Sequence, residues 1–190
     1  MENPYMVLVN GENRLPEGFE NMVQLVSVEN AVGEKYQVEE KTYQAFLQLR
    51  EDLLQNDGIQ AELISSYRTV KTQEEIFQYY TERFGLEYAQ KYAAKPGHSE
   101  HHTGFAIDVG FLLDGKVDHA IASLLSVEHL FQIVHKKLPK YGFILRYPQG
   151  KEAATRIGYE PWHFRYIDSG QIAAEITDQG LCFEEYMQKV

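Results

Sequence analysis

Hydrophobic positions recur at two different spacings along the chain, and each spacing predicts one kind of secondary structure. Apolar residues fall three or four positions apart over residues 38–56, which places them on one face of a helix. Asp57-Gly58 follows and would end that helix. Residues 5–28 mix short apolar runs with turn residues, and we expect extended segments there. Alternating or β-branched residues predict strands over 60–67, 104–111, 142–147 and 162–167.

Further helices are predicted by residues that start or end helices. Thr72-Gln73-Glu74-Glu75 matches a capping box, so a second helix should open at Thr72 and end at Gly85. Ser126 and Ser169 are suited to cap helices that end near residues 138 and 180, and a short helix is expected over 86–93. Strands and helices are mixed without a strict β-α-β rhythm, which favours an α+β fold with a central, mainly antiparallel sheet flanked by helices. No repeat or linker interrupts the sequence, so we expect a single domain over residues 1–190.

Composition narrows the class of protein. Hydrophobic residues make up 44% and charged residues 24% of the chain, as in globular proteins. The formal net charge of -10 disfavours nucleic acid and anionic lipid as partners, and no apolar run approaches the ~20 residues that span a membrane. A single cysteine, Cys182, excludes an internal disulfide and a four-cysteine zinc site. Residues 1–16 lack a secretory signal pattern, so we expect a cytoplasmic protein, and no obligatory protein partner is indicated.

The histidines are unevenly distributed, and they suggest a metal site. Three of the seven, His98, His101 and His102, lie within five residues of one another just before a predicted strand. In that strand Asp108 shares a face with small residues only, which leaves space beside its carboxylate. His101, where the chain enters the strand, could fold back to the same point, whereas His102 should face away.

A second cluster, Glu160-Pro161-Trp162-His163, places a carboxylate three residues before a histidine. If His163 joins His101 and Asp108 around a metal, Glu160 would stand beside it as a general base. Two imidazoles and one carboxylate leave the fourth position of a tetrahedral zinc site open, which is the arrangement of catalytic zinc.

Each of these residues also has an ordinary structural interpretation. A single histidine beside a strand is more often a surface or hydrogen-bonded residue than a ligand. Asp108 alone could cap a turn, Glu160 could be a solvated charge, and Trp162 is more often a core residue. His119, His129 and His135 fall on segments predicted as helical, and we do not expect them to bind metal.

The two motifs together resemble a known family. Ser-x-His-x-x-Gly-x-Ala-x-Asp, at residues 99–108, and Glu-x-Trp-His, at residues 160–163, resemble the signature of the D-alanyl-D-alanine metallopeptidases, the VanY, VanX and VanXY group. Their architecture is shared with Hedgehog and lysostaphin-type domains. Ser65-Ser66-Tyr67-Arg68 with Gln73, and Arg146-Tyr147-Pro148, also resemble family segments, so the likeness covers roughly residues 6–167.

The resemblance implies a role for individual residues. His101, Asp108 and His163 would bind one zinc ion per chain. Glu160 would move the proton, and Arg68 would stabilise the oxyanion. Substrate binding would fall to Ser99, at the terminal carboxylate, and to Gln73.

The absence of a leader suggests the VanXY type within the family. Such an enzyme cleaves the D-Ala-D-Ala dipeptide and the last D-Ala of the peptidoglycan precursor pentapeptide, which deprives vancomycin of its target. One alternative is a wall-trimming D,D- or L,D-carboxypeptidase, of VanY or LdcB type, that lacks its leader. Another is a zinc-bearing binding module without catalysis, although Glu160 and Arg68 argue against it.

Overall fold

An antiparallel sheet forms the centre of the computed structural model, which describes residues 3–190. Its strands follow the order β3-β4-β7-β6, and the short strand β5 pairs with β4. The strands are β3 (Ala61–Ser65), β4 (Ala106–Leu113), β5 (Lys116–Val117), β6 (Phe143–Tyr147) and β7 (Glu160–Tyr166). All four strand pairings in this sheet are antiparallel, so the predicted α+β class with a mainly antiparallel sheet is confirmed.

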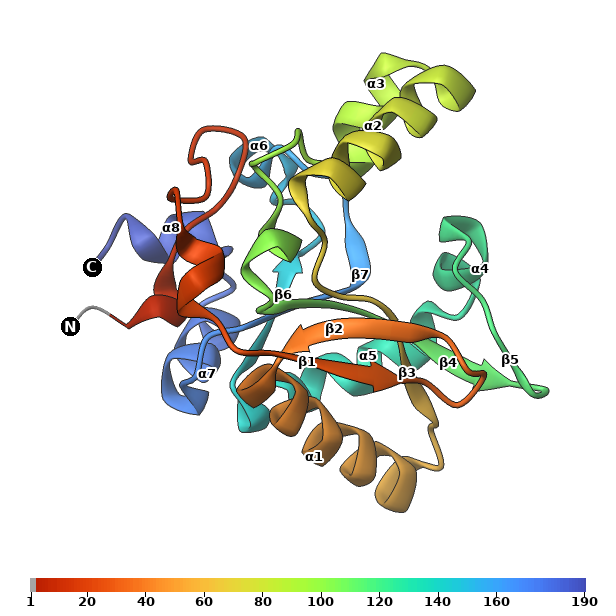
Figure 1. Cartoon of the computed structure of the whole chain (residues 1–190). Coiled ribbons are helices and arrows are strands. Elements are labelled where there is room, and N and C mark those ends of the chain that lie inside the picture. Colours follow the sequence, from red (N-terminus) through yellow and green to blue (C-terminus); the bar gives the residue numbers. More distant parts are fainter. Residues whose placement is uncertain (1–2) are drawn as a thin grey trace.

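Helices and one separate hairpin surround this sheet (Figure 1). The hairpin pairs β1 (Leu25–Glu29) with β2 (Lys35–Glu39). The helices are α1 (Glu40–Asp57), α2 (Val70–Phe84), α3 (Leu86–Tyr92), α4 (Ile121–Ser126), α5 (Glu128–Lys137), α6 (Glu152–Thr155), α7 (Gly170–Asp178) and α8 (Phe183–Met187). Single 3-10 turns are η1 (Pro4–Met6), η2 (Phe19–Met22), η3 (Glu100–Thr103) and η4 (Leu138–Tyr141). Figure 1 shows α1 at one end of the molecule and the α2–α3 pair projecting at the other.

The main core lies between the sheet and helices α1 and α5. The alternation predicted for the strand before Asp108 is confirmed, because Phe105, Ile107 and Val109 all point into this core. Leu49 of α1 and Phe131 of α5 meet them there and have no exposed surface. A second, smaller core packs α7 and α8 against β6. The strands that carry the candidate site are therefore fixed on their far faces by apolar packing.

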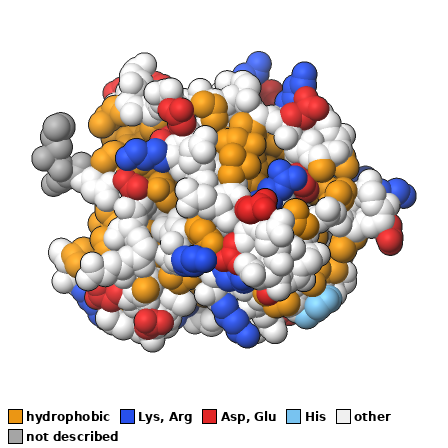
Figure 2. All heavy atoms as spheres, turned by 90° about the horizontal axis from the view of Figure 1, so that it is seen from below, with side chains coloured by type: hydrophobic (Ala, Val, Ile, Leu, Met, Phe, Trp, Pro, Cys, Tyr) orange, Lys and Arg blue, Asp and Glu red, His pale blue; other side chains and the backbone are white. Residues whose placement is uncertain are grey.

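Charged side chains are scattered over the outer side of this core. Figure 2 views the molecule from the side of α1 and shows basic and acidic side chains interspersed with hydrophobic ones. Ion pairs also join elements: Asp52 of α1 pairs with Lys137 at 2.7 Å and with Lys140 at 3.1 Å. Among residues 3–190, no helix is both long enough and apolar enough to cross a membrane.

Several predicted element boundaries are wrong. The segment 5–28, expected to be extended, holds β1 but also most of the 3-10 turn η1 and all of η2. The first helix begins at Glu40 because Val38 and Glu39 belong to β2. The second helix begins at Val70, capped by the Thr69 side chain, which accepts a hydrogen bond from the Thr72 backbone N–H. The expected capping box at Thr72 is therefore inside the first turn.

The predicted start at Ser126 is also wrong, whereas the cap at Ser169 is confirmed. Ser126 is the last residue of a separate short helix, α4, and α5 starts after Val127. The Ser169 hydroxyl oxygen accepts a hydrogen bond from the Ile172 backbone N–H at the start of α7. Among the strands and α-helices, five short elements were not predicted: β2, β5, α4, α6 and α8.

Candidate active site

Three side chains from separate elements converge beside the sheet. His101 comes from η3, Asp108 from β4 and His163 from β7. The antiparallel pairing of β4 and β7 sets Asp108 directly opposite His163. Asp108 Oδ2 lies 3.3 Å from His101 Nε2, and Asp108 Oδ1 lies 2.9 Å from His163 Nδ1. One potential ligand atom from each of the three residues lies within 4.8 Å of the others, so the predicted convergence is present.

A tight turn between Ser99 and Gly104 returns His101 to the start of β4. The Ser99 hydroxyl oxygen accepts a hydrogen bond from the His101 backbone N–H at 3.4 Å. Gly104 ends the turn with a φ of +75°, and a Cβ there would lie 3.0 Å from Leu25 and 3.2 Å from Glu39. The spacing of the Ser-x-His-x-x-Gly motif thus has a physical reason, since a larger residue at Gly104 would be strained and would press on the hairpin.

The two candidate histidine ligands present different nitrogens to the cluster. Nδ1 of His101 lies 2.7 Å from the Ser66 carbonyl oxygen, so Nε2 faces the cluster. His163 is reversed, because its Nδ1 lies near Asp108 and 3.6 Å from Glu160 Oε2. His102 turns away, as expected, and its Nδ1 contacts the Arg68 carbonyl oxygen at 2.7 Å.

The donor set fits a divalent metal. His101 Nε2 and Asp108 Oδ1 are buried and make no hydrogen bond of good geometry among the described residues, although each lies within 3.3 Å of a polar atom of the cluster. Unpaired buried polar atoms cost free energy, so their convergence needs an explanation. Two imidazole nitrogens and one carboxylate oxygen are ligands that zinc prefers, and three such ligands from the described residues would leave one position of a tetrahedral site for water or substrate.

Burial and neighbouring charges shift the acidities at the site in different directions. Burial raises the pKa of Glu160 to about 8, against the opposing charges of His163 and Arg68. Burial and the nearby Arg68 guanidinium lower the pKa of His101 to about 4. Burial also disfavours the charged form of His163, but Asp108, with Glu100 and Glu160, outweighs burial and raises the His163 pKa to about 9. A carboxyl group with a pKa near neutrality is suited to both accepting and donating a proton.

These residues open into a cleft of about 460 Å³. Arg68, Ser99 and Glu160 line it together with the cluster. Gln73 does not line it. Its side-chain amide instead donates a hydrogen bond to the Ala94 carbonyl oxygen at 2.8 Å, and so it fixes a residue of the cleft wall.

The cleft also contains residues that sequence reasoning missed. Tyr80 of α2, Tyr147 of β6 and His119 of the loop after β5 all line it. His119 was assigned to a predicted helix, and nothing in its neighbours distinguishes it from a surface residue. The Trp162 side chain belongs to the main core, as expected, and also reaches the cleft wall.

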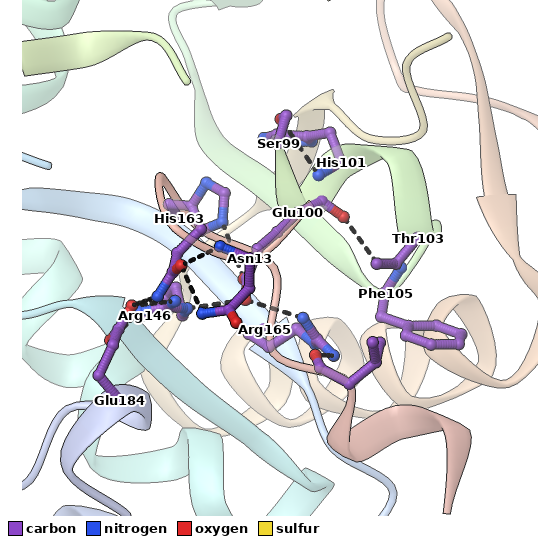
Figure 3. Close-up of polar contacts among 12 residues, drawn as sticks. Asn13, Ser99, Glu100, His101, Thr103, Phe105, Arg146, His163, Arg165 and Glu184 are labelled. Carbon is purple, nitrogen blue, oxygen red and sulfur yellow. Dashed lines mark hydrogen bonds and ion pairs between the residues drawn. The ribbon is translucent and has the colours of Figure 1, made fainter. Parts of the chain in front are cut away.

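A fully buried group of charges lies behind the cluster, and sequence reasoning missed it too. Arg146 and Arg165 have no exposed surface, and both donate hydrogen bonds to Glu100 Oε1 at 2.8 Å (Figure 3). Arg146 also makes two hydrogen bonds to the Glu184 carboxylate of α8. The signals in the sequence were weak: Arg146 follows the apolar residues Phe143 to Leu145 and was noted only within a family-like segment, and Arg165 lies two residues after the second motif.

Comparison with known proteins gives consistent results. The VanY family profile, described as D-alanyl-D-alanine carboxypeptidase, matches residues 35–169. The bifunctional D-Ala-D-Ala dipeptidase and carboxypeptidase VanXYC of Enterococcus gallinarum is 38% identical over 138 residues, which are 72% of this chain and 72% of that protein.

Two solved structures are similar over nearly the whole chain. The LdcB LD-carboxypeptidase has a TM-score of 0.80 at 33% identity, covering 100% of this chain and 89% of the other. A mutant of the vancomycin resistance D,D-pentapeptidase VanY, in complex with Zn(II), has a TM-score of 0.79 at 27% identity, covering 97% of this chain and 99% of the other. Through its two motifs, its fold and this profile match, the chain belongs to the VanY family of D-alanyl-D-alanine carboxypeptidases.

Proposed function

We propose that the protein is a zinc-dependent D,D-dipeptidase and D,D-carboxypeptidase. Its substrates would be the D-Ala-D-Ala dipeptide and the terminal D-Ala of the peptidoglycan precursor pentapeptide. The observation that carries this proposal is the group of His101, Asp108 and His163 in a cleft that also holds Glu160 and Arg68. One zinc ion per chain would be held by His101 Nε2, an Asp108 oxygen and His163 Nδ1.

The protein's own residues would bind the peptide and move the proton. When bound, zinc would polarise the scissile carbonyl and make water more acidic. Glu160, on the same side of His163 as Asp108, would accept a proton from the attacking water and return it to the leaving amine. Because burial raises its pKa to about 8, both steps are accessible near neutral pH.

Two further side chains would recognise charge on the substrate. Arg68 lines the cleft and its Nε has no hydrogen-bond partner among the described residues, so its guanidinium is free to face a developing oxyanion. Ser99 would contribute to binding the terminal carboxylate. Direct contact of Gln73 with the substrate stays a prediction, since its amide nitrogen is already bonded to Ala94.

The choice of substrate rests on similarity. The likeness to the bifunctional VanXYC supports hydrolysis of both the dipeptide and the pentapeptide, and with it a contribution to vancomycin resistance. The likeness to an LD-carboxypeptidase over the whole chain supports a second candidate, a trimming carboxypeptidase that acts on the tetrapeptide. A cytoplasmic location stays a prediction that cell fractionation would test.

The decisive experiment compares three peptides. Purified protein should contain one zinc per chain and should release D-alanine from the dipeptide and from a pentapeptide precursor. Activity on a tetrapeptide precursor alone would favour the trimming carboxypeptidase and contradict the bifunctional proposal.

A variant of the proposed base tests for catalysis itself. Glu160→Ala should keep its zinc and lose hydrolysis by about 10²–10⁴-fold, which is the usual contribution of a general acid–base group. Glu74→Ala removes an exposed carboxylate of α2 and should hydrolyse at the wild-type rate. A zinc-loaded wild type that cleaves none of the three peptides would support the non-catalytic binding module instead.

A further inference from the structure

Glu100 lies between the buried arginines and the candidate metal cluster (Figure 3). Its Oε1 accepts hydrogen bonds from Arg146 Nε and from Arg165 Nη1, both at 2.8 Å. Its other oxygen, Oε2, is buried, has no hydrogen-bond partner among residues 3–190, and lies 3.8 Å from His163 Nε2. The Glu100 side chain is 0% exposed, so water does not replace the missing partner from the surface.

His163 has a matching unpaired atom. Its Nδ1 faces Asp108 and Glu160, whereas its Nε2 is buried and also lacks a partner in the described part of the chain. A neutral imidazole that binds a metal through Nδ1 carries its proton on Nε2 and needs an acceptor there. Glu100 Oε2 is the unpaired carboxylate oxygen that faces this nitrogen.

The other histidine of the cluster has a comparable arrangement. His101 faces the cluster with Nε2, and its opposite nitrogen lies 2.7 Å from the Ser66 carbonyl oxygen. Metal-binding histidines generally donate the second N–H to a carbonyl or carboxylate oxygen, which fixes the ring and its tautomer. A closure of about 1 Å would bring Glu100 and His163 to the same kind of contact.

We propose that Glu100 is a positioning residue for the candidate zinc site. It accepts a hydrogen bond from His163 Nε2–H and so directs Nδ1 toward the metal. This inference rests on the proposed function, because it requires that the cluster binds zinc.

The buried arginines hold Glu100 in this orientation. Arg165 also donates hydrogen bonds from Nη2 to the carbonyl oxygens of Tyr5 and Val7, so its guanidinium is fixed independently of Glu100. Arg146 is fixed by both oxygens of Glu184 at 2.7 and 2.8 Å. With Oε1 held by two such groups, the carboxylate does not rotate away from His163.

Glu100→Gln tests the proposal, and Glu184→Gln is its matched control. In Glu100→Gln the amide oxygen can keep both arginine bonds, which leaves an NH₂ group facing the His163 N–H. Zinc affinity, measured by competition with a chromophoric chelator, should fall about 10- to 100-fold. Glu184→Gln also neutralises a carboxylate paired with Arg146, but on the side away from His163. It should lower the melting temperature of the zinc-free protein while its zinc affinity stays close to that of the wild type.

A spectroscopic measurement on the wild type keeps the test independent of variant folding. With ¹⁵N-labelled histidine and bound zinc, His163 should be protonated at Nε2. Protonation at Nδ1 would overturn the proposal, and so would equal zinc affinities for Glu100→Gln and the wild type. In either case wild-type hydrolysis of the peptides would leave the proposed function standing. A wild type that binds no zinc would overturn both.

Discussion

Replacement of Arg68 by alanine should remove catalysis while leaving the fold intact. The backbone of Arg68 is held from both sides: its N–H donates to the His101 carbonyl oxygen at 3.2 Å, and its own carbonyl oxygen contacts His102 Nδ1 at 2.7 Å. Neither contact involves the side chain. The guanidinium itself lies in the cleft near Asp108 and Glu160. Removal of the Arg68 side chain therefore takes a positive charge from the site and leaves both backbone hydrogen bonds in place.

The expected loss of kcat in Arg68→Ala follows from the position of the guanidinium in the cleft. Loss of one donor to a developing oxyanion costs about 10²–10³ in kcat, or about 2.7–4 kcal/mol. A second effect adds to it at neutral pH. Arg68 lowers the pKa of Glu160, so in Arg68→Ala that pKa rises above about 8. A smaller fraction of Glu160 is then ionised at pH 7, and the acidic limb of the kcat/KM profile moves to higher pH.

Steady-state hydrolysis of the pentapeptide, followed through released D-alanine, measures both effects. Arg83→Ala, at an exposed position of α2, removes a positive charge elsewhere and should leave kcat unchanged. The zinc affinity of Arg68→Ala should be equal to or higher than that of the wild type, because a cation is removed from beside the cluster. A kcat within about tenfold of the wild type, or a loss confined to KM, would refute the assignment of Arg68 to the oxyanion.

Further predictions concern stability. Thr69→Ala should cost about 1 kcal/mol in urea unfolding because it removes the cap of α2, and an equal or larger loss in Thr72→Ala would contradict that assignment. Burial disfavours the Glu100 carboxylate, but its two arginine partners outweigh burial and hold its pKa well below its usual range. The ionised Glu100 thus stabilises the fold above the unfolded-state pKa of about 4.3. As the pH falls below that value, the free energy of unfolding of the wild type should decrease, and it should decrease less steeply with pH in Glu100→Gln. Leu49→Ala empties a fully buried core position and should cost about 2–5 kcal/mol; a loss below 1 kcal/mol would show that the core collapses into the space. Adding zinc to chelator-treated protein at about 100 times the dissociation constant should raise the melting temperature by roughly 5–10 °C, and no shift would argue against a site formed only in the folded state.

Local sequence predicted the elements whose signals are local. The strand through Asp108 followed from strict alternation, and its core-facing residues, such as Ile107, are where alternation placed them. The start of α7 followed from Ser169 before an apolar helical pattern. The predicted element boundaries are wrong where a segment pairs with residues distant in the sequence. Glu39 belongs to β2 because it pairs with Leu25 of β1, and its N–H also donates to the carbonyl oxygen of Gly104, a partner 65 positions away that no local pattern reveals.

The sequence by itself determined which residue types are available for chemistry, because the two motifs hold two histidines and two carboxylates at family spacings. Only the tertiary structure decided how they face one another: that His163 presents Nδ1, that Tyr80 and His119 reach the cleft, and that Gln73 is bonded to its wall. It also decided that Glu100 is buried. A carboxylate is tolerated in a protein interior only where opposite charges pair with it. The charges that pair with Glu100 are Arg146 of β6 and Arg165 of β7, which lie 46 and 65 residues further along the chain. Contacts over such separations depend on strand pairing and burial, which no window of local sequence contains.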